Sequence, residues 1–134
     1  MMLLLQTTYL EVNYYRQEQL LETSWKGPCS SQEYRDCLNT YSNILQKYKI
    51  KRWLDDQALA GQVRQADQFW TVQEWTANFI PLASKLKKVA QVNALEGHTY
   101  SLSTILQQVI YAGKCPFAFR EFDSHPEAKT WLLS

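Results

Sequence analysis

The sequence predicts one α/β domain built on a mixed sheet of about five strands, with helices packed against that sheet. Three observations favour this class. Near the start, a segment of alternating apolar and polar residues is followed by a second strand-like segment, later amphipathic helix patterns lie between strand patterns, and capping signals occur where the helices begin. The predicted order is a β-hairpin followed by alternating units, β-β-α-β-α-β-α-β-α. Residues 1–134 are expected to form a single domain, because a chain of 134 residues leaves little room for a second.

The hairpin is predicted from Thr8–Tyr14, where apolar and polar residues alternate as in a half-buried strand, and from the strand-like run Leu20–Trp25. Leu3–Gln6 either extends this hairpin or pairs beside it. Gly27 and Pro28 end the second strand.

A first helix is predicted after Ser30, because Ser30 and Glu33 have the spacing of a capping box. This helix has a single apolar face, whose residues follow the offsets i, i+3, i+4, i+7, i+11 and i+14. They are Tyr34, Cys37, Leu38, Tyr41, Leu45 and Tyr48. Ile50–Leu54 is the next strand, with Asp55 and Asp56 at its carboxyl end.

The segment Gln57–Gln68 has no clear period and is predicted to be a loop. Thr71 and Glu74 form a second capping-box match, so the second helix is expected to begin there, with Phe69 and Trp70 at most an earlier turn. Pro81 lies inside this pattern and is expected to kink or break the helix near Asn78–Pro81.

The last third of the chain repeats the alternation of strand and helix. The expected elements are a strand over Leu86–Val92, a helix over Ser101–Ala112, a strand over Phe117–Phe122 and a short helix capped by Ser124. Each helix is long enough to be a crossover, so these strands should run parallel and the hairpin should supply an antiparallel edge.

The composition narrows the classes of function. Apolar residues make up 46% of the chain and the formal net charge is +1, without a long basic run, so nucleic-acid partners are not expected. Met1–Leu5 is too short for a signal peptide or a membrane span, which predicts a cytoplasmic protein. The three cysteines lack metal-ligand spacing and no cofactor motif occurs, so no metal and no cofactor is expected.

Six segments together carry a resemblance to a known family: Glu22–Gly27, Lys51–Asp56, Trp70–Trp75, Leu86–Ala90, Phe119–Asp123 and Glu127–Leu132. In their order and spacing, the chain resembles SpoIIAA-like proteins with the STAS or CRAL-TRIO-like fold, small bacterial single-domain proteins of unassigned role. Anti-sigma-factor antagonists of that fold carry a phosphorylated serine in an Asp-Ser-Ser-Gly-like motif. The corresponding stretch here, Asp55–Gly61, has no Ser or Thr, so that phospho-switch is not carried over.

Candidate polar site residues follow from a general property of open sheets, in which ligands bind beyond the carboxyl ends of parallel strands. Asp55 and Asp56 could bind a cation or act as acid and base, or simply cap a loop, and as neighbours in a strand they should point to opposite faces. Glu96 and His98 could serve a metal or a proton transfer, although such a pair in a glycine loop is also a common coincidence. The same rule selects Asn93, Asp123 and His125.

Aromatic residues are numerous, with five Trp and eight Tyr. Trp75 and Phe79 share a helix face and are predicted to be core residues. Trp70 lies five positions before Trp75, so a continuous helix would turn it well away. It is either a partner anchor or a residue buried under the loop that precedes it.

The favoured function is a non-catalytic protein-interaction or regulatory domain that self-associates as a homodimer or binds another protein. The alternative is a carrier or sensor of a small apolar, lipid-like ligand in a pocket lined by Phe69, Trp70, Trp75, Phe79 and the third helix. An enzyme would require Asp55 or Asp56 to converge with His98, and no residue is assigned as catalytic.

Overall fold

The computed structural model describes residues 1–95 and 117–134, and these residues form a six-stranded sheet in the order β1-β2-β3-β4-β5-β6. The first three strands pair antiparallel, and β3 to β6 pair parallel. The predicted α/β class with a mixed sheet is therefore confirmed. The strands are β1 (Met2–Gln6), β2 (Leu10–Tyr15), β3 (Leu20–Trp25), β4 (Arg52–Asp56), β5 (Lys88–Val92) and β6 (Ala118–Phe122).

The count of about five strands was too low because Met2–Gln6 is a strand of its own. It pairs beside the hairpin, on β2, with a register irregularity between Leu3 and Leu5. This segment is almost wholly apolar and does not alternate, so its pattern shows no period from which a separate strand could be recognised.

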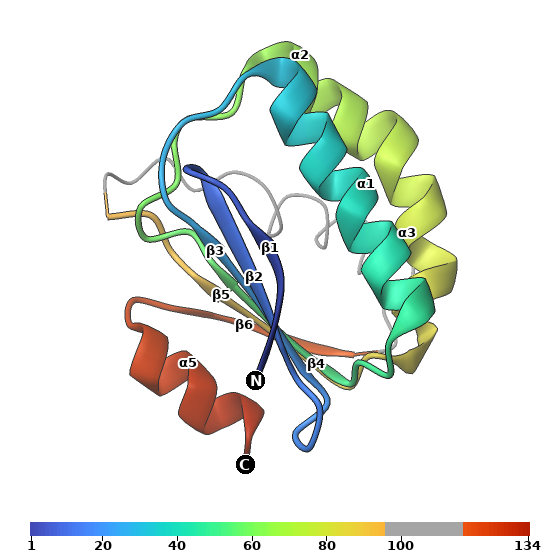
Figure 1. Ribbon diagram of the computed structural model, residues 1–134, viewed down its shortest axis with the longest axis vertical. Helices are drawn as coiled ribbons and strands as arrows, with labels where there is room; N and C mark the ends of the chain where they lie inside the picture. Colours follow the sequence, from blue (N-terminus) through green and yellow to red (C-terminus); the bar gives the residue numbers. More distant parts are fainter. Residues whose placement is uncertain (96–116) are drawn as a thin grey trace.

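Helices cover both faces of the sheet (Figure 1). One face carries α1 (Ser31–Lys47) and the continuous helical run formed by α2 (Gln65–Trp70), η1 (Thr71–Trp75), α3 (Thr76–Leu82) and η2 (Ala83–Lys85). The opposite face carries α5 (His125–Leu132). We call these the α1 face and the α5 face. The connections from β3 to β4 and from β4 to β5 move in the same direction across the sheet. Because connections between parallel strands are right-handed, the helices of these two connections lie on the same face.

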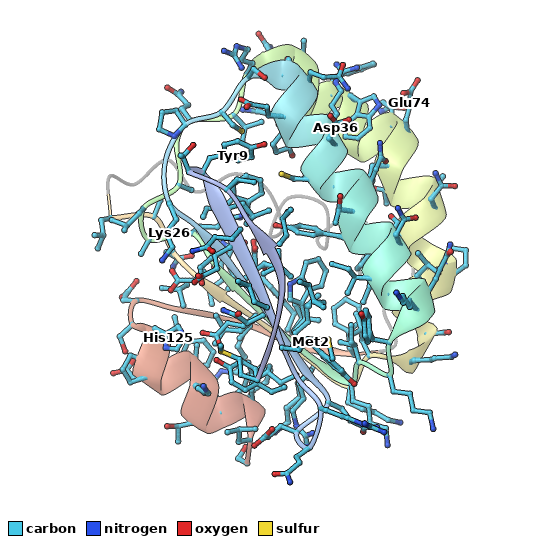
Figure 2. The ribbon with its side chains drawn as sticks, in the orientation of Figure 1. Met2, Tyr9, Lys26, Asp36, Glu74 and His125 are labelled. Atoms are coloured by element: carbon cyan, nitrogen blue, oxygen red, sulfur yellow. The ribbon has the colours of Figure 1, made fainter. Side chains whose placement is uncertain are left out.

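Strand alternation divides the apolar residues between two cores, as Trp53 and Leu54 show. Trp53 is fully buried on the α1 face, in a cluster with Phe79, whereas Leu54 is fully buried on the α5 face, in a cluster with Leu20 and Leu132. Figure 2 shows side chains filling the space between the sheet and the helices on both sides. Burial of these side chains on both faces is the main source of stability of the fold.

The first helix follows its sequence pattern. Ser30 Oγ accepts a hydrogen bond from the Glu33 backbone N–H (3.2 Å), and the Ser30 N–H donates to Glu33 Oε1 (2.8 Å), so the predicted capping box is present. Its buried residues are those of the predicted apolar face, with Ile44 added and Tyr48 at the C-cap.

The second helix differs from its pattern in two ways. It begins at Gln65, not at Thr71, so the loop that precedes it is shorter than predicted. Thr71 is instead a buried residue inside the helix, where its hydroxyl donates to the Asp67 carbonyl (2.7 Å) and bonds to the Tyr34 hydroxyl (2.8 Å). A capping-box spacing can occur inside a helix, and here tertiary contacts use the Thr71 hydroxyl for another purpose.

Of the kink or break predicted near Asn78–Pro81, the break is absent. The helix runs through Pro81 to Leu82 and then tightens into the short turn η2, so Pro81 lies in its last turn. The helix is distorted earlier, where Thr71–Trp75 form a π turn and the Thr76 N–H donates to the Thr71 carbonyl.

The remaining elements confirm the pattern with shifted ends. Ser124 caps α5 as predicted, accepting a hydrogen bond from the Glu127 N–H (3.3 Å). β4 extends two residues beyond the predicted end at Leu54, because Asp55 and Asp56 pair with β3. These two residues are therefore the last residues of the strand. The helix predicted over Ser101–Ala112 lies outside the described residues. None of the helices in residues 1–95 and 117–134 combines the length and the apolar character that a membrane span requires.

Candidate functional site

A small cavity lies on the α1 face at the carboxyl ends of β3 and β4. Its volume is about 40 Å³. The loop after β3 and the loop over residues 57–64 line it together with α1. Its aromatic walls are Trp25, Tyr34, Tyr41, Trp53 and Trp75. We call this cavity the Asp55 pocket, after the carboxylate that lines it.

Asp55 is buried in this pocket, with only 2% of its surface exposed. One carboxylate oxygen accepts a hydrogen bond from the Thr23 hydroxyl (2.7 Å), and the other accepts one from the Gln57 amide (2.8 Å). The Trp53 indole N–H in turn donates to Thr23 Oγ1 (3.0 Å), which holds that hydroxyl in place.

The charge of Asp55 is not balanced by a neighbouring cation. Among residues 1–95 and 117–134, no Lys, Arg or His forms an ion pair with this carboxylate. Burial raises the pKa of Asp55 to about 6, although the hydrogen bonds from Gln57 and Thr23 act in the opposite direction. At neutral pH the pocket therefore contains a buried, mostly ionised carboxylate.

The Tyr41 hydroxyl is another buried polar group of the pocket. It is buried and makes no hydrogen bond of normal geometry with the described residues, while its ring packs edge-on against Trp53 at 5.3 Å between centroids. Burial, and then the negative charge of Asp55, raise the pKa of Tyr41 well above its ordinary value. Tyr41 therefore remains a neutral O–H group that can donate to a ligand.

Asp67, the other buried carboxylate of the pocket, is fully satisfied. It accepts hydrogen bonds from the Ser31 hydroxyl (2.5 Å) and from Arg35 Nε (2.9 Å). These bonds tie the first turn of α2 to the first turn of α1. Arg35 also lies 5.0 Å from the centroid of the Trp70 ring.

The two loops at the rim touch each other closely. A Cβ atom at Gly61 would lie 2.5 Å from Pro28 Cα, a distance that no real contact allows, so only glycine fits at this position. Arg64 adds a second link, because its guanidinium donates to the Cys29 carbonyl (3.2 Å). The rim of the pocket thus depends on contacts between residues about 33 positions apart.

The structure separates the two predicted carboxylates, as strand alternation requires. Asp55 shares the α1 face with Trp53, whereas Asp56 shares the α5 face with Leu54. Asp56 caps the following loop by accepting the Ala58 N–H (3.0 Å). His125 lies on α5, where Figure 2 labels it, and hydrogen-bonds to the buried carboxylate of Glu22.

Of the predicted aromatic residues, only Trp75 lines the Asp55 pocket. Its ring is buried and its indole N–H donates to the Leu38 carbonyl (2.8 Å). Phe79 stacks on Trp75 with 4.9 Å between centroids, but it is fully buried in the core and does not line the pocket.

Trp70 is not turned away from the core as expected. Its ring is half-buried and packs edge-on against Tyr34 at 6.5 Å between centroids. The π turn explains this difference, because i and i+5 positions lie much closer together around a π helix than around an α helix. Phe69 is the exposed aromatic residue of this segment, at 68%.

Glu96 and His98 lie outside the described residues, so the convergence of His98 with Asp55 or Asp56 stays a prediction. Sequence reasoning missed Trp25, Tyr41 and Gly61. Trp25 could have been found by the same rule that selects Asp55, because Trp25 is the last residue of β3 and Asp55 lies at the end of the neighbouring strand β4. Tyr41 lies on the apolar face of a helix and was indistinguishable from an ordinary core residue.

A scan of protein-family models, a search of curated proteins and a search of solved structures find no match for this chain. The resemblance to SpoIIAA-like proteins therefore stays a prediction.

Proposed function

We propose that this chain is a non-catalytic regulatory domain that binds a small ligand in the Asp55 pocket. One observation carries the proposal: an aromatic-walled cavity contains a buried carboxylate without a counter-charge among the described residues. Apolar walls with a few convergent polar groups are typical of small-molecule sites. The pocket also lies where ligands bind in sheets with parallel strands.

The energetics of Asp55 support a binding role. Burial of an ionised carboxylate costs free energy that its hydrogen bonds only partly offset, as the raised pKa shows. Groups with strongly perturbed pKa values concentrate at functional sites. A ligand that supplies hydrogen-bond donors to Asp55 would offset this cost when it binds.

The proposed pocket differs from the lipid-like pocket expected from the sequence. Its walls come from β3, β4, α1 and Trp75, and neither Phe69 nor Phe79 is among them. A volume of about 40 Å³ has room for about three water-sized groups, so a lipid chain does not fit. We therefore propose a small polar ligand in place of an apolar one.

A ligand-observed NMR screen of a fragment library tests the proposal. Ala60 lines the pocket, so Ala60→Trp should fill it, whereas Ala66 is exposed on α2 and Ala66→Trp is the matched control. We expect fragments to bind the wild type and Ala66→Trp, and binding to be lost in Ala60→Trp while circular dichroism shows an unchanged fold. Equal binding to Ala60→Trp would contradict the proposal, as would a screen without any hit.

Self-association is a second candidate, and the edge strand β1 favours it. Within the described residues β1 pairs only with β2. It carries no charged residue, and Met2 and Leu3 are each 46% exposed. Proteins usually protect such edges with charge or proline, and an unprotected edge can pair with a second copy.

Light scattering tests this candidate on wild type and Leu3→Lys, since lysine at an edge strand opposes pairing. We expect a dimer for the wild type and a monomer for Leu3→Lys. A monomeric wild type at concentrations near 100 μM, as an order of magnitude for weak association, would refute it.

A further inference from the structure

We infer that the ligand of the Asp55 pocket presents a positively charged ammonium group to Asp55. This inference rests on the proposed binding function and names the chemical class of the ligand. Three features of the pocket support it: the balance of charge, the aromatic walls and the size of the cavity.

The charge balance differs between the two buried carboxylates of the pocket, Asp55 and Asp67. Asp67 is neutralised by Arg35, whereas the donors to Asp55, which include Thr23 and Gln57, are neutral groups. An ionised carboxylate can accept about four hydrogen bonds, so Asp55 can accept a further N–H donor from a ligand. A cationic donor would gain the most, because charge-assisted hydrogen bonds are stronger than neutral ones and the attraction is weakly screened in a buried site.

The walls favour a cation in the same place. Aromatic rings attract a positive charge over their faces, with an energy that increases when the site is desolvated. Five aromatic residues line this small cavity, and two of them, Tyr41 and Trp53, pack against each other beside Asp55. The buried Tyr41 oxygen, which has no partner among the described residues, can also accept an N–H group.

The size of the cavity and its ligand set favour an ammonium group over a divalent metal ion. A cavity of about 40 Å³ admits an ammonium group with one or two carbons, while the rest of a longer ligand would lie outside it. Calcium and magnesium ions take six or more oxygen ligands, and the cavity is too small for the ion together with the waters that would complete the shell around Asp55, Gln57 and Tyr41. Arg64 is the nearby cation at the rim, but it is exposed, so water screens its repulsion.

The test compares 2-phenylethylammonium with 2-phenylethanol, two probes of nearly equal size that differ in charge. Isothermal titration calorimetry at pH 7.5 measures both probes on wild type, Asp55→Asn and Asp56→Asn. We expect the wild type to bind the ammonium at least about tenfold more tightly than the alcohol, and Asp55→Asn to lose this preference. Asp56→Asn removes the same charge one residue away on the other face and should keep the preference.

A pH series adds a second readout on the wild type. Because the pKa of Asp55 is about 6, its carboxylate is mostly protonated at pH 5, and affinity for the ammonium should be lower there. Affinity for the alcohol should change little. The nearby titratable and charged groups are Tyr41, Asp56, Asp67 with its partner Arg35, and Arg64, and none of them is removed in Asp55→Asn.

The outcomes separate this inference from the proposed function. Equal or tighter binding of the alcohol to the wild type refutes the charge of the ligand and leaves the pocket as a binding site. The same holds if fragments bind in a manner sensitive to Ala60→Trp but the ammonium does not bind. If no fragment binds at all, the proposed function fails and the inference fails with it.

Discussion

Replacement of Asp55 by Asn should stabilise the protein at neutral pH. The substitution keeps the shape of the side chain and removes its ionisable group. Thr23 can still donate to the amide oxygen, and the Gln57 amide can rotate so that its oxygen accepts from the new amide group. The fold therefore loses a buried charge without the loss of its hydrogen-bond partners.

The magnitude follows from the pKa of Asp55, which burial raises from 3.8 to about 6. That interval is about 2.2 pKa units, and each unit corresponds to about 1.4 kcal/mol, which gives an upper limit of about 3 kcal/mol. Because Asn makes weaker hydrogen bonds than a carboxylate, we expect a gain of about 1–3 kcal/mol at pH 7.5.

The sign of the pH dependence is also determined. Between pH 3.8 and about 6 the folded protein binds more protons at Asp55 than the unfolded chain does. The contribution of Asp55 to the free energy of unfolding is therefore most favourable below pH 3.8. It declines as pH rises through this window, and the decline is complete above about pH 6.

Urea denaturation monitored by tryptophan fluorescence at pH 4, 5, 6 and 7.5 measures both effects. The difference in the free energy of unfolding between Asp55→Asn and wild type isolates Asp55 from other titrating groups. This difference should grow as pH rises from 3.8 to about 6. Asp56→Asn, with its carboxylate half-buried on the other face, is the control and should show no such growth. A difference that is constant with pH, or an Asp55→Asn protein that is less stable at pH 7.5, would refute the reasoning.

Two further substitutions test the rim and the smaller core. Gly61→Ala should force the loop away from Pro28, lower stability by about 1–3 kcal/mol in urea denaturation and weaken ligand binding, whereas Gly27→Ala meets no atom within 4 Å and should be nearly neutral. Leu132→Ala should lower the free energy of unfolding by about 2–5 kcal/mol and increase amide hydrogen exchange in α5, because Leu132 is fully buried there. Leu133 is exposed, so Leu133→Ala is the control and should change stability little. Equal losses for the two leucines would contradict the packing described for α5.

The parts of the fold that depend on local signals were predictable. The first helix has a capping box at Ser30 and an apolar face with helical spacing, and both are present in the structure. The hairpin follows from alternation over consecutive residues. The register of Trp70 and Trp75 was not predictable, because the π turn between them is compensated by contacts of Thr71 and Trp70 with Tyr34, which is distant in sequence.

The site was predictable only at one point. The rule for strand ends selects Asp55, and the structure buries that residue in a pocket. The Tyr41 pattern indicates a core position but cannot show that the core has a cavity beside it. The contact of Gly61 with Pro28 joins two loops whose sequences carry no common signal.

The amino-acid pattern alone therefore decides the α/β class, the alternation of strands and helices and the position of Asp55 near the end of a strand, because each follows from interactions among neighbours in the chain. The environment of Asp55 is decided only by the tertiary structure. Burial, the missing counter-charge among the described residues and the aromatic walls arise where β3, β4, α1 and two loops meet, and free energies at such a meeting point depend on groups distant in sequence.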